Sequence, residues 1–150
     1  MPISTRRATA SDLPRLVELL QQLSLEEPRE SPDEPLDAYR RAFARIDADP
    51  NQQLLVAESE GRVVGTLVVV VIANLSHRGK PWAVVENVVV DAAVRGQGVG
   101  EALLREAEAI ARAAGCFKLS LTSNKRRDDA HRFYGRLGFR ATHEGFRLEF

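Results

Sequence analysis

Three glycines at alternating positions, Gly96, Gly98 and Gly100, stand between an apolar run and an amphipathic run, where a strand would pass into a helix. Glycine lets the backbone approach a bulky ligand closely. The first turn of a helix presents N–H groups without a partner in the helix, together with the positive end of the helix dipole. The combination predicts a site for an anion, and phosphate suits it best. The alternative is a turn whose glycines serve backbone geometry alone.

The residues around these glycines exclude two common phosphate sites. A P-loop has Lys followed by Ser or Thr after its last glycine, whereas this chain continues with Glu101. A dinucleotide-binding turn has the spacing G-x-G-x-x-G and an acidic residue about 20 positions later. The spacing here is G-x-G-x-G, and the later position is Ser120. The anion must therefore belong to another class of ligand.

Length and composition favour one globular domain over residues 1–150, since 44% of the residues are hydrophobic and 28% are charged. Lys and Arg number 21, and so do Asp and Glu, which leaves no overall basic field for nucleic acid or an anionic membrane. The longest apolar run, residues 63–73, is shorter than the roughly 20 residues of a membrane helix. The one cysteine, Cys116, excludes an intrachain disulfide. We expect a cytoplasmic protein without a nucleic-acid or membrane partner.

Hydrophobic periodicity predicts the elements that position the glycine turn. Helical spacing marks four segments: residues 13–23, 36–46, 99–114 and 129–137. Beyond a strand near the start, β-rich runs mark six segments: residues 53–59, 62–73, 82–90, 117–121, 139–142 and 146–150. The first two runs should form a hairpin, and the proline-rich acidic segment 26–35 should be a loop bordering a substrate site. The fold class is mixed α/β: a mostly antiparallel sheet of about seven strands with about four flanking helices.

The glycine run resembles the signature of the GNAT family of N-acetyltransferases. That signature is Arg or Gln, two residues, Gly, one residue, then Gly or Ala, and it is matched by Arg95-Gly96-Gln97-Gly98-Val99-Gly100. The strand at 86–90 and the segments 121–124 and 130–139 also look like the cofactor-binding half of that family, in the same order. Together these segments cover roughly residues 84 to 140.

The resemblance implies acetyl-coenzyme A as the acyl donor and a sheet splayed at its site. The main chain of Val88 and Val90 would pair with the pantetheine arm, which lies like an added strand. The glycine segment would hold the pyrophosphate through backbone N–H groups. Asn124 matches a position that contacts the pantetheine arm, and Tyr134 matches the tyrosine near the sulfur. The full expected set is Val88, Val89, Val90, Arg95, Gly96, Gln97, Gly98, Val99, Gly100, Glu101, Asn124 and Tyr134.

Direct transfer of an acetyl group to an amine requires a base, because a lysine-like amine has a pKa of about 10.4 and is protonated at neutral pH. Glu86 is the candidate, since it is a lone carboxylate in an apolar strand and partial burial would raise its pKa. It would act directly or through a water; the alternative is a structural role at a strand irregularity. Tyr134 would protonate the departing thiolate, or it packs in the core. The N–H of Val88 would stabilise the oxyanion.

Other reactive side chains are assigned no chemistry. Cys116 is expected to be a small core residue. The three histidines lack metal-ligand spacing, so no metal site is predicted. The basic run at 125–127 either meets an anionic group of the cofactor or substrate, or is solvated. Three residues before Trp82 are candidate substrate contacts: His77, Arg78 and Lys80.

The sequence therefore predicts an acetyl-coenzyme A dependent N-acetyltransferase that acts on a primary amine of a small molecule in a ternary complex. A non-catalytic acyl-coenzyme A sensor and an acetyltransferase for a protein amine are the alternatives. A hydrolase is disfavoured because no activated nucleophile is present. Residues 124–139 resemble aminoalkylphosphonate acetyltransferases, which suggests an amine with an anionic end; polyamines, amino acids and aminoglycosides stay open. A homodimer is also expected, formed through strand edges or through Phe146, Leu148 and Phe150, unless these are core residues.

Overall fold

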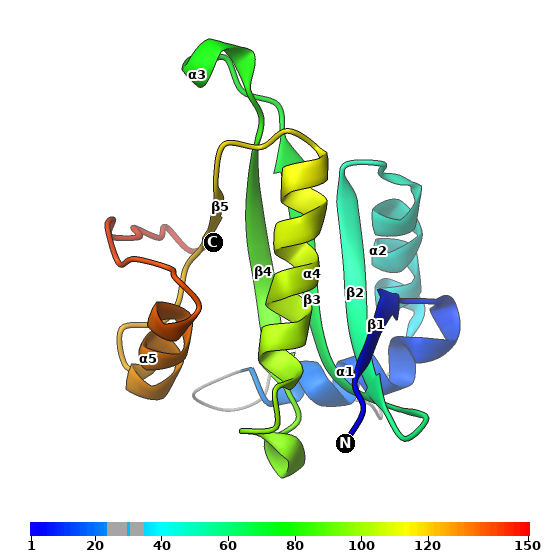
Figure 1. The fold of residues 1–150 in the computed structure, drawn as a ribbon. Coiled ribbons are helices and arrows are strands. Elements are labelled where there is room, and N and C mark those ends of the chain that lie inside the picture. Colours follow the sequence, from blue (N-terminus) through cyan, green and yellow to red (C-terminus); the bar gives the residue numbers. More distant parts are fainter. Residues whose placement is uncertain (24–29, 31–34) are drawn as a thin grey trace.

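Five strands form one open sheet in the computed structural model, which describes residues 1–23, 30 and 35–150. In spatial order they are β1 (Ser4–Arg7), β2 (Gln52–Ser59), β3 (Arg62–Ile72), β4 (Trp82–Val90) and β5 (Leu119–Leu121) (Figure 1). Neighbouring strands are antiparallel except β4 and β5, which are parallel. The mixed, mostly antiparallel sheet and the hairpin of β2 and β3 are as expected from the sequence.

Helices cover both faces of the sheet (Figure 1). They are α1 (Leu13–Gln21), α2 (Asp37–Ala48), α3 (Ser76–Gly79), α4 (Val99–Ala113) and α5 (Asp128–Arg136), with 3-10 turns η1 (Ala10–Asp12) and η2 (Ala92–Val94). The four helices predicted from periodicity are present. The short α3 is an additional element that the periodicity does not predict. The loop predicted at residues 26–35 falls almost entirely outside the described residues.

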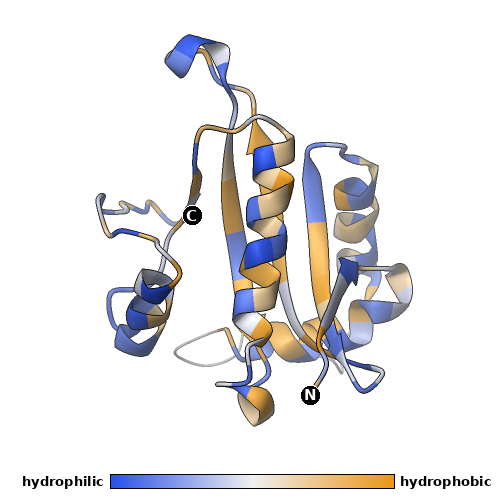
Figure 2. Ribbon diagram, in the orientation of Figure 1, coloured by the Kyte–Doolittle hydropathy of each residue, from blue (hydrophilic) through white to orange (hydrophobic). Residues whose placement is uncertain are grey.

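The alternation along β2 divides the core between the two faces. Leu55 and Ala57 pack in the cluster under α4, whereas Leu54 and Val56 pack in the cluster under α1 and α2. The buried face of α4 includes Leu103, which has no exposed surface. Burial of such a side chain contributes about 1.5–3 kcal/mol. In Figure 2, polar and apolar residues lie on separate stripes of α4, which is the pattern of a helix with one buried face.

The contact between α4 and β3 depends on Gly65. A Cβ at this position would lie 2.8 Å from Cγ1 of Val99 and 3.1 Å from Cδ1 of Leu103. The missing side chain thus lets the first turns of α4 pack directly on the strand. Because Val99 follows the glycine turn, Gly65 helps to determine where that turn lies over the sheet.

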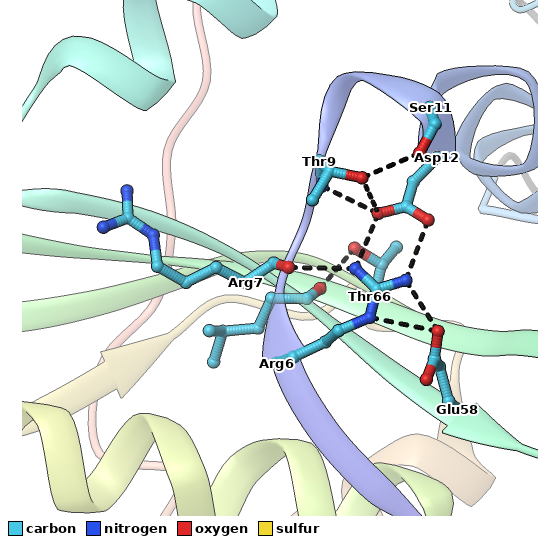
Figure 3. A network of polar contacts seen from close by, with 8 residues as sticks. Arg6, Arg7, Thr9, Ser11, Asp12, Glu58 and Thr66 are labelled. Carbon is cyan, nitrogen blue, oxygen red and sulfur yellow. Dashed lines mark hydrogen bonds and ion pairs between the residues drawn. The ribbon is translucent and has the colours of Figure 1, made fainter.

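An ion-pair network connects β1 to β2 and to the start of α1 (Figure 3). The guanidinium of Arg6 donates to both carboxylate oxygens of Asp12, at 2.8 and 2.9 Å, and to Oε1 of Glu58 at 2.6 Å. The backbone N–H of Thr9 also donates to Asp12, at 2.7 Å. The hydrogen bonds from Arg6 lower the pKa of Asp12 below its ordinary value. Thr9 is the N-cap of η1.

The two C-terminal strands predicted at residues 139–142 and 146–150 are wrong, and the sheet of the described chain has five strands instead of about seven. Residues 140–150 are exposed throughout. The side chains of Phe146, Leu148 and Phe150 are 92%, 82% and 116% exposed, so the possibility that they are core residues is also contradicted. A period-two pattern makes a strand only where another strand accepts its hydrogen bonds, and none does so here.

The helices of residues 1–23 and 35–150 include no segment long and apolar enough to span a membrane.

Candidate functional site

Strand β4 carries an irregularity at its centre, where Asn87 has a positive φ of 55°. Val85 lies opposite Val69 and Val89 lies opposite Thr66, so β4 holds one residue more than β3 across this interval. The extra residue reverses the side-chain alternation: Val85 packs under α4, whereas Val89 packs under α1. This is a β-bulge, a feature that redirects side chains and often stands beside active sites.

The bulge coincides with the point where β4 and β5 separate. Their parallel pairing covers Ala83, Val84 and Val85 of β4 and ends there. Over residues 86–90, β4 has β3 along one edge, and no other described strand pairs with its second edge. Backbone N–H and C=O groups along such an edge are available to an extended ligand. The pairing of β4 with β5 therefore ends where the resemblance implies a splay.

The glycine turn leads from this edge into α4. Gly96 and Gly98 have positive φ angles of 79° and 87°, a conformation that side chains with a Cβ disfavour. Gly98 is the N-cap of α4 and, with no side chain, supplies no side-chain capping hydrogen bond. The N–H groups of the first helical turn have no acceptor within the helix. Residues 95–98 are exposed, while Val99 is buried.

Gly100 brings the turn, the strand and α5 together. A Cβ at Gly100 would lie 3.0 Å from Cζ of Phe133 and 3.5 Å from Cγ2 of Val90. The segments 86–90, 95–100 and 130–139 thus meet at one point, although more than 40 positions separate Val90 from Phe133 in the chain.

Glu86 lies on β4 directly before the bulge, opposite Val68 of β3. Its side chain is exposed, so the partial burial expected from its apolar neighbours in sequence is wrong. The bulge explains the difference, because Glu86 and Asn87 stand at the unpaired edge, where no parallel strand covers them. In Figure 2 this is a hydrophilic stretch within an otherwise apolar strand.

A cavity of about 200 Å³ lies between α1, α2 and the sheet, and it reaches Asn87. Its walls include Leu16 and Leu20 of α1, Phe43 of α2 and Val68 of β3. None of the described residues that line it carries a charge. The cavity is therefore a largely apolar space that reaches the residue after Glu86.

Tyr134 lies on α5, half-buried against the cluster under α4. Its ring makes an edge contact with Phe139 at 6.0 Å between centroids. Burial raises the pKa of Tyr134 above its ordinary value, and the positive charge of Arg127 opposes this shift. The hydroxyl consequently holds its proton at neutral pH. Arg127 in turn donates to the backbone carbonyl of Leu23, which connects the start of α5 to the end of α1.

Asn124 shapes the turn that leads into α5. Its Oδ1 accepts from the backbone N–H of Arg126 at 2.9 Å, and its backbone carbonyl accepts from the N–H of Arg127 at 3.0 Å. Nε2 of His131 lies 2.9 Å from the same carbonyl. Both oxygens of Asn124, which was expected to contact the cofactor, thus accept hydrogen bonds within this turn. Lys125 and Arg126 are exposed.

The residues proposed as substrate contacts before Trp82 lie elsewhere. His77 and Arg78 belong to α3, which stands at the opposite end of the sheet from the glycine turn (Figure 1). His77 stacks on Phe117, with ring centroids 3.8 Å apart. The structure therefore does not bring these residues to the open edge of β4.

The remaining reactive groups form no site of their own. Burial raises the pKa of the Cys116 thiol, which disfavours the thiolate that a nucleophile requires. Across residues 1–23, 30 and 35–150, no three side chains of the His, Cys, Asp or Glu types cluster closely enough to hold a metal ion.

One connection beside the site was missed in the sequence. Arg15 of α1 donates to Asp91, directly after β4, at 2.5 Å, and to the carbonyl of Val63 at 2.9 Å. Oδ1 of Asp91 accepts from the N–H of Ala93 at 3.1 Å. Asp before a short helical turn is a capping signal that the sequence does contain. Nothing in the sequence pairs it with an arginine 76 positions away.

The comparisons with known proteins agree with this geometry. The sequence model of the Acetyltransferase (GNAT) family matches residues 16–139. The chain is 35% identical to an aminoalkylphosphonate N-acetyltransferase of Salmonella typhimurium over 97% of its own length and 91% of the relative's. It is 33% identical to a probable glucosamine 6-phosphate N-acetyltransferase of Oryza sativa over 91% and 81% of the two chains.

A solved structure described as a transcriptional regulator from Bacillus halodurans superimposes with a TM-score of 0.93 at 38% identity, covering 99% of this chain and 100% of that one. Together, the family match over most of the chain and the identity to named N-acetyltransferases show that the chain belongs to the acetyltransferase (GNAT) family, an enzyme family whose acyl donor is acetyl-coenzyme A.

Proposed function

We propose that the chain transfers the acetyl group of acetyl-coenzyme A to a primary amine of a small molecule, by direct attack of the amine in a ternary complex. One observation carries the proposal: the unpaired edge of β4 over residues 86–90 stands directly before the glycine turn at the start of α4. An edge for an extended amide-bearing arm and a set of N–H groups for a pyrophosphate are thus neighbours.

The residues at this place suit acetyl-coenzyme A. The backbone of Val88 and Val90 would bind the pantetheine arm, with Val89 between them buried under α1. The N–H groups of residues 95–101 would bind the pyrophosphate. No heavy atom outside its chain neighbours stands within 4 Å of a Cβ built at Gly96, so the backbone there is open to a ligand. Asn124 and Tyr134 would border the arm from the side of α5.

The proton movements fall to Glu86 and Tyr134. As the bond between nitrogen and the acetyl carbon forms, the amine must lose a proton, and Glu86 would receive it directly or through a water. The N–H of Val88 would donate to the carbonyl oxygen as that oxygen gains negative charge. As the bond between carbon and sulfur breaks, Tyr134 would give its proton to the sulfur and regain one from solvent. Its raised pKa supports this role, because the hydroxyl is protonated before the reaction.

The apolar cavity beside Asn87 would hold the carbon skeleton of the acceptor. It reaches Asn87, the residue after Glu86, and has no charged group among its described lining residues, so it suits an aliphatic or aromatic portion and not a phosphate. An acceptor with an anionic end is the second candidate. It is favoured by the relatives that act on aminoalkylphosphonate and glucosamine 6-phosphate, and Arg127 beside Tyr134 is the cation that would meet the anion.

Calorimetric titration of acetyl-coenzyme A into the protein tests the donor site. The matched pair of variants is Gly98→Glu and Gly115→Glu, because both glycines have positive φ but Gly115 lies at the other end of α4. We expect micromolar binding that Gly98→Glu abolishes and Gly115→Glu retains. Equal binding by both variants would place the donor elsewhere.

Release of the coenzyme A thiol then identifies the acceptor class. The panel comprises phenylethylamine, a linear alkylamine, an aminoalkylphosphonate, glucosamine 6-phosphate, a polyamine and a short peptide. Turnover with the first two supports an apolar acceptor, and turnover with the next two supports the anionic one. Turnover with the peptide alone would contradict a small-molecule acceptor. Donor binding without turnover by any amine would favour a sensor.

A further inference from the structure

The apolar cavity that reaches Asn87 adjoins a polar hollow beside the end of α2. The hollow has a volume of about 300 Å³, and five residues line it: Ala42, Arg45, Ile46, Asp49 and Gln52. Three of them, Ala42, Ile46 and Gln52, also line the apolar cavity. The hollow lies where α2 ends and β2 begins (Figure 1). A ligand in the apolar cavity can therefore extend to a place that holds one cation and one anion.

The two charged side chains of the hollow are not neutralised within the described part of the chain. Arg45 and Asp49 stand one helical turn apart, yet neither forms an ion pair there. By contrast, Asp47 of the same turn lies 3.7 Å from Arg7. Oδ1 of Asp49 accepts from the backbone N–H of Asn51 at 2.9 Å, which fixes this carboxylate in the turn after α2. The guanidinium of Arg45 and the carboxylate of Asp49 are thus both available to a ligand.

The position of Asp49 favours a cation from outside the chain. Asp49 is the C-cap of α2, where the helix dipole has its negative end and a carboxylate is unfavourable. An ammonium group placed there would interact favourably with the carboxylate and with the last carbonyl groups of the helix. A carboxylate of the ligand would instead bind the guanidinium of Arg45, whose N–H groups match it with two parallel hydrogen bonds. The hollow therefore suits a ligand end that carries one charge of each sign.

The register of the strands limits the length of such a ligand. Gln52 of β2 lies opposite Val70 of β3, and Glu86 of β4 lies opposite Val68. The Cα atoms of Gln52 and Glu86 are therefore two residues apart along the strands and two strand spacings apart across them, a distance of about 12 Å. A chain of four methylene groups extends about 6 Å between an amine and the next carbon, and the side chains at the two ends reduce the remaining distance. Leu54 and Val68 line the apolar cavity in this interval.

We propose that the acceptor is an α,ω-diamino acid of the lysine type, whose carboxylate binds Arg45 and whose α-ammonium group binds Asp49. Its methylene chain lies in the apolar cavity, as the stem of a lysine side chain does against apolar surface, and its ω-amine lies beside Glu86. This inference rests on the proposed acetyl transfer and names the acceptor at that same site.

The two ends of the ligand then have different fates. The ω-nitrogen forms a bond with the acetyl carbon and loses its proton to Glu86, while the bond between that carbon and sulfur breaks and the sulfur takes a proton from Tyr134. The α-nitrogen stays protonated at Asp49, away from the thioester. The product is therefore the ω-N-acetylated amino acid.

Calorimetric titration of four amines into the protein saturated with coenzyme A tests the two charge contacts without turnover. L-lysine has both charged groups at its far end, pentane-1,5-diamine lacks the carboxylate, 6-aminohexanoate lacks the α-ammonium group, and pentylamine lacks both. We expect lysine to bind at least roughly tenfold more tightly than either compound that lacks one group, since each contact is a charge-assisted hydrogen bond. Equal affinity for lysine and pentylamine overturns the proposal.

Variants of the same helix assign each contact to one side chain. Arg45→Gln should abolish the preference for lysine over pentane-1,5-diamine, and Asp49→Asn, which still caps the turn at Asn51, should abolish the preference for lysine over 6-aminohexanoate. Arg41→Gln and Asp47→Asn change exposed charges of α2 outside the hollow and should keep both preferences. A preference that survives in Arg45→Gln or Asp49→Asn overturns the corresponding contact.

Thiol release from acetyl-coenzyme A separates this inference from the proposed function. We expect release with lysine and, by mass spectrometry, acetylation of its ω-nitrogen; acetylation of the α-nitrogen overturns the proposed orientation. Release with other amines but not with lysine would support acetyl transfer and contradict this acceptor. Lysine binding with the expected preferences but without release would support the two charge contacts and contradict acetyl transfer.

Discussion

The guanidinium of Arg15 lies 2.5 Å from the carboxylate of Asp91, across 76 positions of the chain. Both side chains are mostly buried, at 18% and 15% exposure. The pair connects α1, which lines the apolar cavity, to the end of β4, where the turn towards α4 begins. The ion pair thereby fixes the position of α1, on the proposed acceptor side of the site, relative to the end of β4, on the proposed donor side.

We expect Arg15→Ala to lower the free energy of unfolding by about 1–3 kcal/mol, because Asp91 then keeps its carboxylate partly buried without its cationic partner. Urea denaturation measures the change. The control is Arg105→Ala, which removes exposed ion pairs on α4 and should cost less than about 1 kcal/mol. Equal losses of unfolding free energy in the two variants would show that the buried ion pair of Arg15 contributes no more than the exposed ion pairs of Arg105.

The second prediction concerns pH. Hydrogen bonds from Arg6 lower the pKa of Asp12, so the folded protein binds this proton less tightly than the unfolded chain does. The stabilisation is complete above the ordinary Asp pKa of about 3.9 and is lost as the pH falls through the lower folded value. We expect Asp12→Asn to cost about 1–3 kcal/mol of unfolding free energy at pH 7 and progressively less below about pH 4.

Urea denaturation at several pH values checks this dependence on Asp12. Asp37→Asn, at an exposed ion pair, serves as the control and should differ little from the unaltered protein at any pH. A difference for Asp12→Asn that stays constant from pH 7 to pH 2 would contradict the assignment.

The third prediction uses two glycines. Gly65→Ala places a Cβ 2.8 Å from Val99, and we expect a loss of about 1–3 kcal/mol in the free energy of unfolding as α4 is pushed away from β3. Gly135→Ala lies within α5, with no atom within 4 Å of the added Cβ, and should stabilise the protein by about 0.5–1 kcal/mol. Thermal denaturation should therefore give shifts of opposite sign.

The fourth prediction concerns Tyr134. Tyr134→Phe keeps the ring contacts but removes the proton donor, and we expect kcat to fall about 100-fold while KM for acetyl-coenzyme A changes less than about twofold. Since burial raises the pKa of this tyrosine, its ionisation should not reduce kcat below about pH 10 in the unaltered enzyme. An unchanged kcat would remove Tyr134 from the chemistry.

The fifth prediction concerns the cavity. Ala42 lines it, is exposed and lies on α2, so Ala42→Phe would fill the space without disturbing the core. We expect KM for the acceptor to rise by roughly tenfold, with the dissociation constant of acetyl-coenzyme A unchanged. Ala44→Phe, on the same helix but outside the cavity, is the control. Identical kinetics for the two variants would place the acceptor elsewhere.

The amino-acid sequence by itself determined the local elements and the family. Hydrophobic spacing located α1, α2 and α4, whose apolar residues recur at a helical period. A continuous apolar run located β3, which is buried on both faces. The glycine run located the start of α4, since its backbone conformation depends on the residues themselves.

Only the tertiary structure decided which distant residues meet. The bulge at Asn87 exposes Glu86, which an apolar neighbourhood in sequence had suggested was partly buried. The pair of Arg15 and Asp91 and the contact of Gly100 with Phe133 join segments far apart in the chain. The segment ending at Phe150 has the pattern of a strand yet forms none in the single chain, because a strand is completed by its neighbour and not by its own sequence.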